Sequence, residues 1–157
     1  MINRIIIENF KGIKHADIPF SQKNVIVGNN GVGKSTILEA ISLALGQSNH
    51  GFELTPYLFH RSTWNNLNKS SLPSIIIEVY LHNISGFEEF TGKNNTLRTE
   101  CLGIKFEAKF DESYMELIET EELTQIPCEY YIINRSWFSE DIVKPFLQPF
   151  SVQVINS

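Results

Sequence analysis

One stretch decides the fold: residues 25–41 read VIVGNNGVGKSTILEAI. Three apolar residues come first, and their short run beside polar Lys23-Asn24 predicts a strand buried on both faces. A glycine-rich turn follows, and from Lys34 the apolar residues recur with the 3.6-residue period of a helix. Gly46 is a natural residue for ending that helix. The apolar face of the predicted helix consists of Ile37, Leu38, Ile41 and Leu45.

The turn satisfies the pattern G-x-x-x-x-G-K-[ST] of a P-loop. Its glycines permit backbone angles closed to other residues, so that main-chain N–H groups can surround phosphate oxygens at the helix N-terminus. Lys34 supplies a positive charge for the β- and γ-phosphates, and the Ser35 hydroxyl is a hard oxygen ligand for Mg²⁺. The sequence thus predicts binding of ATP with Mg²⁺. The predicted contacts are Gly28, Asn29, Asn30, Gly31, Val32, Gly33, Lys34, Ser35 and Thr36.

Two parts that hydrolysis would require are missing from the sequence. The first is a second apolar strand ending in Asp-Glu, which would hold Mg²⁺ and activate water. The run Ile75 to Glu78 comes nearest, but it has no Asp and continues as an ordinary strand, so Glu78 is a weak candidate for a base. The second is a signature loop of the L-S-G-G-Q type, which residues 84–86 echo poorly. No catalytic residue is therefore assigned in this chain.

The rest of the chain favours an α/β (α+β) domain with a mixed sheet around the P-loop helix. A hairpin is expected over residues 5–20, with its turn at Lys11-Gly12, and an irregular, exposed loop over 47–71. We treat 1–157 as one partial ATP-binding domain, divided into 1–46, a long loop at 47–73 and a β-rich remainder at 74–157. Further strands are predicted at 74–81, 96–102, 104–110, 129–133 and 152–155, with 114–123 open between helix and strand and Gly103 a possible bulge.

Net charge, cysteine spacing and the lack of long apolar runs argue against several classes of protein. The net charge of −5 argues against a dedicated nucleic-acid binder whose whole surface is basic. Cys101 and Cys128 are far apart and form no C-x-x-C pair, which indicates reduced thiols in a cytosolic protein. The N-terminus does not read as a signal peptide, and no apolar run approaches the length of a membrane span. A cytoplasmic protein with no membrane partner is expected.

Two quoted stretches carry a resemblance to a known family. Residues 7–13 (IENFKGI) and 28–41 (GNNGVGKSTILEAI) resemble the N-terminal lobe of the ABC-type ATPases of DNA maintenance, the RecF, SMC and OLD (overcoming lysogenization defect) groups. The Asn30-Gly31 pair matches their narrower form of the P-loop. Sustained heptads, which would lead into an SMC coiled coil, are absent from the sequence. The β-rich remainder looks like the ATPase domain of OLD-family nucleases and related phage-defence ATPases.

This resemblance implies further properties. The complete protein would carry a C-terminal metal-dependent nuclease (Toprim) domain, act on DNA and form a homodimer through its ATPase heads. This chain would then be an N-terminal fragment, with a natural short relative as the alternative. Lys11 matches a basic position near the adenine or ribose. Asn83, Asn134 and Arg135 are possible counterparts of a polar residue that helps to hold Mg²⁺.

Other functions stay open at this point. A RecF- or SMC-type repair ATPase head is one alternative. A non-catalytic module, in which nucleotide acts as a switch and the 47–71 loop contacts a partner, is another. A small kinase or GTPase is the third alternative, but the sequence contains no N-K-x-D motif that would support it.

Overall fold

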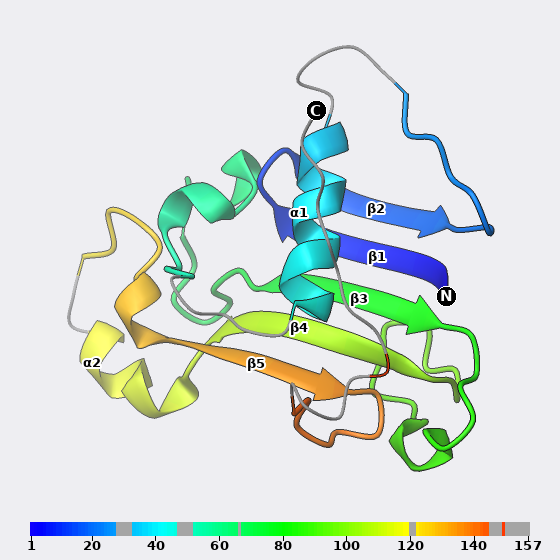
Figure 1. Ribbon diagram of the computed structural model, residues 1–157. Helices are drawn as coiled ribbons and strands as arrows, with labels where there is room; N and C mark the ends of the chain where they lie inside the picture. Colours follow the sequence, from blue (N-terminus) through cyan, green and yellow to red (C-terminus); the bar gives the residue numbers. More distant parts are fainter. Residues whose placement is uncertain (28–32, 47–51, 66, 120–121, 145–148, 150–157) are drawn as a thin grey trace.

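The computed structural model describes residues 1–157 except 28–32, 47–51, 66, 120–121, 145–148 and 150–157. A five-stranded sheet in the order β2-β1-β3-β4-β5 forms its centre (Figure 1), and each neighbouring pair is antiparallel. The strands are β1 (Ile2–Phe10), β2 (Ile13–Pro19), β3 (Ile75–Leu81), β4 (Gly103–Phe110) and β5 (Tyr131–Trp137). The helices are α1 (Lys34–Leu45) and α2 (Met115–Glu119), and short 3₁₀ turns occupy Pro56–Leu58, Arg61–Thr63, Glu88–Phe90, Glu112–Tyr114 and Cys128–Tyr130.

The predicted N-terminal hairpin is confirmed. β1 and β2 pair in the register Phe10↔Ile13 and Ile7↔Ala16, so the chain reverses at Lys11-Gly12. Asn9 and Lys11 take left-handed backbone angles, with φ of 54° and 49°. Asn tolerates that region better than most residues, and a polar side chain at each position leaves the tight turn beside solvent.

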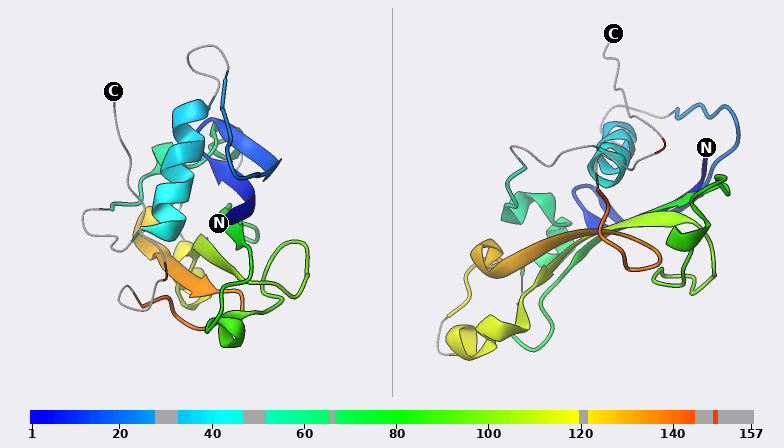
Figure 2. Two further views of the ribbon diagram at one scale, coloured as in Figure 1. Left: turned by 45° about the vertical axis from the view of Figure 1, so that its right-hand side comes forward. Right: turned by 60° about the horizontal axis from the view of Figure 1, so that its bottom comes forward.

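Helix α1 covers one face of the sheet and crosses its strands, as the two views of Figure 2 make clear. The predicted helix and its end at Gly46 are both confirmed, since the Gly46 N–H donates to the Ser42 carbonyl at 2.8 Å. Ala40 and Ala44 are fully buried against the sheet. Their small side chains let the helix backbone approach the strands closely, while the larger apolar residues come from the sheet.

Alternation along the strands supplies most of the core. Ile5 and Ile7 of β1, the odd-numbered residues of β3, and the even-numbered residues of β4 all turn toward α1. Trp137 and Phe106 are fully buried in this layer. Because side chains alternate between faces along a strand, the remaining residues face the other side of the sheet. Ile6, Tyr80 and Phe138 form a small second cluster there.

The prediction that Leu38 belongs to the buried helix face is wrong. Leu38 is 49% exposed, whereas Ile37 and Ile41 are half-buried and pack against the core. Both hydrophobic periodicity and helix propensity favour the helix, but neither says which part of a wide apolar stripe will meet the sheet. The position of α1 over β1, β3 and β4 determines that.

The predicted buried strand at residues 25–27 is also wrong for this chain. These residues lie outside the strands, and the side chains of Val25 and Val27 are 84% and 82% exposed. A strand buried on both faces requires strand neighbours and a covering layer on each side. In the described sheet β1 is already flanked by β2 and β3, so it has no free edge beside the residues that precede the P-loop.

The predicted strand at 96–102 is replaced by a loop. The Gly92↔Cys101 bridge closes this loop, and the buried Glu78 carboxylate accepts hydrogen bonds from the Thr96 backbone N–H at 2.9 and 3.0 Å. Apolar and polar residues alternate over 96–102 as they do in a strand. The Thr96 backbone N–H, however, donates to the Glu78 side chain and not to a neighbouring strand. β4 begins at Gly103, which therefore starts the strand and is not a bulge.

Three other predicted segments are resolved by the fold. The strand at 74–81 is confirmed as β3, and the ambiguous 114–123 contains α2. The strand predicted at 129–133 appears as β5, which starts two residues later, after a 3₁₀ turn, and ends at Trp137. Part of the long loop docks on the core, because Phe59 is fully buried and its neighbour Phe52 meets Phe106 edge-to-face at 5.7 Å. The predicted strand at 152–155 lies outside the described residues. No helix of the described part is long and apolar enough to cross a membrane.

Gly92 and Gly12 provide a matched pair of loop glycines. A Cβ at Gly92 would lie against the Phe138 carbonyl, well inside van der Waals distance, whereas a Cβ at Gly12 would meet no atom within 4 Å. Gly92→Ala is therefore expected to lower the free energy of unfolding by about 1–3 kcal/mol, the usual cost of overpacking. Gly12→Ala should change it by less than about 0.5 kcal/mol. Urea unfolding of both variants measures the difference, and equal midpoints would contradict the close approach at Gly92.

Candidate nucleotide site

The candidate site lies at the N-terminus of α1, where the P-loop sequence joins the helix. Gly33 is the residue before the helix, and its φ of 94° is left-handed, which an L side chain rarely adopts. Its carbonyl accepts the first helical hydrogen bond, from the Ile37 N–H at 3.0 Å. Among the described residues no side chain caps this end, and its first turn contains no acidic residue. The positive end of the helix dipole is thus left for an external anion.

The hairpin turn lies beside this helix end. A Cβ on Gly33 would be 3.6 Å from the Ile13 side chain, so β2 supports the end of the P-loop from the sheet side. One residue before the turn glycine, the Lys11 ammonium forms an ion pair with the Glu39 carboxylate of α1 at 2.5 Å. Lys11, predicted to lie near the adenine or ribose, is therefore beside α1 and already holds a carboxylate. Its contact with nucleotide stays a prediction.

The helical half of the motif is in the expected place. Lys34, Ser35 and Thr36 form the first turn of α1, and Ser35 is exposed there. A hydroxyl in the first turn, next to a lysine and an uncapped helix end, is the donor set that fits a nucleotide phosphate with Mg²⁺. Residues 28–32, the other predicted contacts, lie outside the described residues. The structure therefore tests the helix end of the site and leaves the assignments of individual contacts as predictions.

The suggested counterparts of a Mg²⁺-holding polar residue do not lie beside Gly33. Arg135 is on β5, at the opposite edge of the sheet from β2, and its guanidinium donates to the Gly46 carbonyl at the far end of α1. A helix of 12 residues is about 18 Å long, which separates Arg135 from the P-loop end. Asn134 precedes it on β5 and faces the other side of the sheet. Asn83 follows β3 next to the start of β1, about 25–30 Å along the strand from the hairpin turn.

Arg135 instead has a structural role that the sequence did not reveal. Its charge and hydrogen bond meet the carbonyl end of α1, where cations are favourable. Burial lowers the pKa of its guanidinium below the usual value for arginine. The Lys11–Glu39 pair was also missed. No spacing rule links positions 11 and 39 or 135 and 46, because each pair meets only after α1 lies across the sheet.

Glu78 is not placed to act as a base at this site. Its side chain is 1% exposed, and it points to the face of the sheet opposite α1. There its carboxylate accepts hydrogen bonds from Tyr80 Oη at 2.8 Å and from the Thr96 N–H and hydroxyl. It therefore organises the loop at residues 92–101. In the part of the chain that the structure describes, no group of three or more His, Cys, Asp or Glu residues could hold a metal ion.

Comparison with known proteins identifies the family. The family model described as an AAA ATPase domain matches residues 1–151. An ATP/GTP phosphatase of Helicobacter pylori is 33% identical over 133 residues, which cover 80% of this chain and 34% of that protein. Endonuclease GajA of Bacillus cereus is 27% identical over 139 residues, covering 80% of this chain and 23% of GajA. An OLD nuclease of Thermus scotoductus is 46% identical over 46 residues, 29% of this chain and 9% of its own length.

These matches confirm the resemblance drawn from the two motif stretches and the P-loop NTPase fold class. The chain spans about a third of the Helicobacter relative and less than a quarter of GajA. One of the relatives with a nuclease name is an OLD nuclease, from a group that the motif stretches suggested. This chain belongs to the AAA ATPase domain family and is an ATPase domain of the OLD, RecF and SMC type.

Proposed function

We propose that this chain is the ATP·Mg²⁺-binding N-terminal part of an OLD-like ABC-type ATPase linked to DNA cleavage or phage defence, and that it is incomplete for hydrolysis alone. The observation that carries the proposal is the uncapped N-terminus of α1 after a left-handed Gly33, with Lys34 and Ser35 in its first turn. A helix end of this kind supplies N–H donors, a lysine charge and a hydroxyl to one phosphate-sized region.

Two observations support incompleteness. Glu39 is a carboxylate close to this region, and Lys11 engages it as an ion pair, while Glu78 faces the opposite side of the sheet. Apolar side chains beside the site are exposed: Val25, Val27 and Leu38. Exposed aliphatic groups on the residues leading into a P-loop and on its helix are a surface that another part of the protein would cover. That part would also supply the residues that activate water.

The proposal for the whole protein depends on its relatives. Names that include endonuclease and OLD nuclease support DNA as the substrate of the complete protein, and the ABC-type resemblance supports a homodimer formed through ATPase heads. A cytoplasmic location agrees with such a substrate. A RecF- or SMC-type repair ATPase head is the rival, and it would lack the coupled cleavage of DNA.

A nucleotide titration tests the proposal. The 157-residue chain should bind ATP, and removing Mg²⁺ with a chelator should weaken binding because the Ser35 hydroxyl acts through the ion. Steady-state ATP turnover by the chain should stay at the level of a no-protein control. If ATP bound with the same affinity with and without Mg²⁺, the proposed role of Ser35 as a Mg²⁺ ligand would be refuted. Sustained turnover would contradict incompleteness while leaving the nucleotide site in place.

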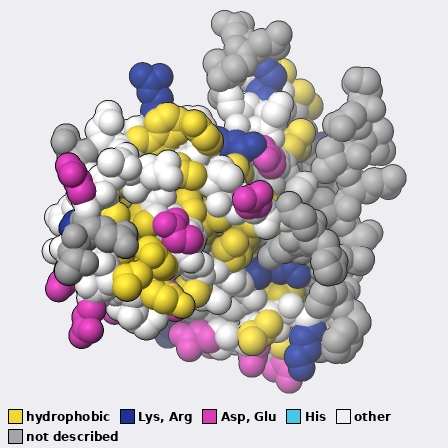
Figure 3. Space-filling model, turned by 90° about the vertical axis from the view of Figure 1, so that its left-hand side faces the viewer, with side chains coloured by type: hydrophobic (Ala, Val, Ile, Leu, Met, Phe, Trp, Pro, Cys, Tyr) yellow, Lys and Arg dark blue, Asp and Glu magenta, His cyan; other side chains and the backbone are white. Residues whose placement is uncertain are grey.

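One surface favours the second candidate function, a nucleotide-switched interaction module. Tyr57 and Trp64 of the long loop stand edge-to-face at 5.6 Å and remain 76% and 38% exposed. Together with Ile126 they line a cavity of about 280 Å³. Figure 3 looks onto the side of the molecule that carries this loop and α2, where apolar side chains lie among acidic ones. Two results of a partner-capture experiment would together favour this candidate. Trp64→Ala would abolish capture of the partner, and ATP would leave capture by the Lys34→Ala variant unchanged.

A further inference from the structure

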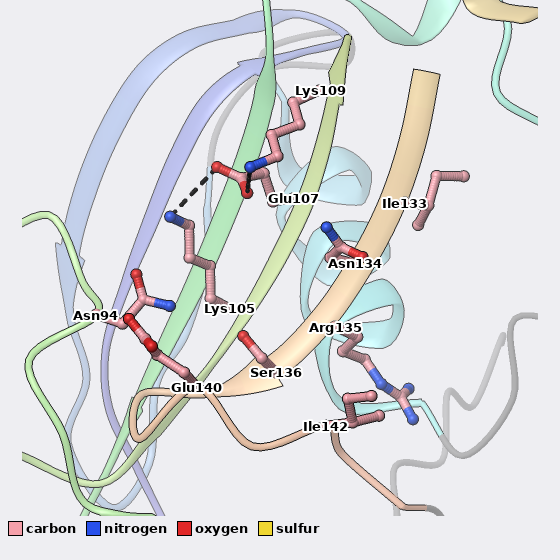
Figure 4. A pocket seen from close by; sticks show the side chains of 10 residues that line it. All are labelled: Asn94, Lys105, Glu107, Lys109, Ile133, Asn134, Arg135, Ser136, Glu140 and Ile142. Carbon is pink, nitrogen blue, oxygen red and sulfur yellow. Dashed lines mark ion pairs between the residues drawn. The ribbon is translucent and has the colours of Figure 1, made fainter. Parts of the chain in front are cut away.

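The face of the sheet opposite α1 carries polar cavities that play no part in the nucleotide site. One, of about 630 Å³, lies over β4 and β5 (Figure 4), and a second, of about 250 Å³, lies between β3, β4 and the loop at 92–101. Lys105 and Asn94 line both, so the two cavities meet at these side chains. Because α1 covers the other face, this hollow is separated from the P-loop by the sheet itself.

Two carboxylates, those of Glu107 and Glu140, line the larger cavity together with Lys105 and Lys109. Glu107 lies between two ammonium groups, at 3.3 Å from that of Lys105 and 3.6 Å from that of Lys109, as Figure 4 shows. One carboxylate thus serves two lysines. The Lys105 side chain is only 16% exposed, so water compensates its charge poorly.

The carboxylate at the floor of the smaller cavity is already occupied. Glu78 accepts hydrogen bonds from the Thr96 N–H, the Thr96 hydroxyl and the Tyr80 hydroxyl. Three cations line this cavity with it, Lys93, Arg98 and Lys105, which leaves a net charge of +2. Lys93 reaches Glu100 at 3.6 Å, but both of those side chains are well exposed and such pairs are weak.

Arg98 is the third cation of the smaller cavity, and its side chain differs from those of the two lysines. Among the described residues, none forms a hydrogen bond or ion pair with its guanidinium, although its backbone N–H donates to the Asn95 carbonyl at 3.0 Å. The backbone of Arg98 has a φ of 51°, a left-handed angle that is uncommon outside glycine. The loop accepts this angle, and Arg98 lines the smaller cavity.

Buried hydrogen bonds hold the loop that presents Arg98. The Asn95 side chain, 7% exposed, donates to the Thr99 carbonyl at 2.8 Å and accepts from the Thr99 N–H at 3.2 Å. Glu78 fixes Thr96 two residues before Arg98, and the Gly92↔Cys101 bridge closes the base of the loop. The cation is therefore presented from a preformed frame, which lowers the entropy lost when a ligand binds.

We propose that Arg98, Lys105 and Asn94, with Lys93 beside them, form a second anion site that takes a phosphate group. A guanidinium fork, an ammonium and an amide donor match the several oxygens of a tetrahedral dianion better than they match a single carboxylate. The phosphate belongs either to a free phosphate ion or to the backbone of a nucleic acid, and the chemistry of recognition is the same for both.

The test uses the 157-residue chain carrying Lys34→Ala. This substitution weakens phosphate binding at the P-loop, so that phosphate binding observed in the titration comes from another site. Inorganic phosphate is titrated while the backbone amides of residues 92–101 are followed by NMR, and a fluorescent ten-residue oligothymidine is titrated by anisotropy. Arg98→Glu is the variant, and Lys14→Glu on the exposed strand β2 is the control with the same change in charge. Lys105→Met is the second variant.

Saturable shifts of the 92–101 amides, weakened at least about 10-fold by Arg98→Glu and by Lys105→Met but not by Lys14→Glu, are the expected result. If the oligonucleotide binds and its affinity depends on the variants in the same way, the phosphate belongs to a nucleic-acid backbone. If inorganic phosphate shifts the amide signals but the oligonucleotide does not bind, the ligand is the free phosphate ion. Equal losses in Arg98→Glu and Lys14→Glu, or no shift in this loop, would overturn the site. Circular dichroism checks that each variant is folded. Loss of ATP binding by Lys34→Ala is measured separately, so failure here leaves the proposed function intact.

Discussion

Replacing Lys34 by alanine is expected to weaken ATP binding about 10- to 100-fold, because a charge-assisted hydrogen bond contributes about 1.5–3 kcal/mol. The lysine stands in the first turn of α1, a turn that contains no acidic residue. The change removes the ammonium and keeps the helix, since alanine has the highest helix propensity. Isothermal titration calorimetry of the wild-type chain and the variant with Mg·ATP measures the effect.

A lysine remote from this site serves as the control. Lys144 is exposed and follows Val143, whose N–H donates to the Arg135 carbonyl on β5, at the opposite sheet edge from Gly33. Lys144→Ala changes the net charge equally and should bind ATP with wild-type affinity. If both variants bound ATP as tightly as the wild-type chain, the phosphate site at the start of α1 would be refuted, and the interaction module would become the leading function.

Phe106→Ala is expected to have the largest effect on stability, about 3–5 kcal/mol. Phe106 is fully buried at the centre of the sheet, paired in register with Ile77 on one side and with Arg135 on the other. Its ring also meets Phe52 edge-to-face, so the truncation opens a cavity between the sheet and the long loop. A loss of this size is a large part of the 5–15 kcal/mol that stabilises a typical domain. Urea denaturation followed by circular dichroism measures it.

Leu117→Ala on the short helix α2 is the matched truncation of an exposed apolar side chain. It should change the free energy of unfolding by less than about 0.5–1 kcal/mol. A cost for Phe106→Ala no greater than that of Leu117→Ala would mean that the centre of the β4 layer is not the core of the domain.

The elements that the sequence predicted well are those with a strong local signal. Lys34 to Leu45 combines helical periodicity with a glycine on either side, and β1, β2 and β3 are rich in β-branched residues. The two strand predictions that failed, at 25–27 and 96–102, failed for non-local reasons. The first depends on neighbours that the described sheet does not offer, and the second was replaced by a loop that the buried Glu78 holds.

Sequence alone determined which groups stand at the start of α1, because Lys34 and Ser35 directly follow the glycines of the P-loop pattern. It also determined the family, since the two motif stretches at 7–13 and 28–41 are short and contiguous in the sequence. Only the tertiary structure decided which partners those groups have. Lys11 meets Glu39, Arg135 meets the end of α1, and Arg98 forms no ion pair with any carboxylate of the described residues on the opposite face. Such relations join residues that are far apart in the chain, so they exist only once α1 and the loop at 92–101 are packed on opposite faces of one sheet.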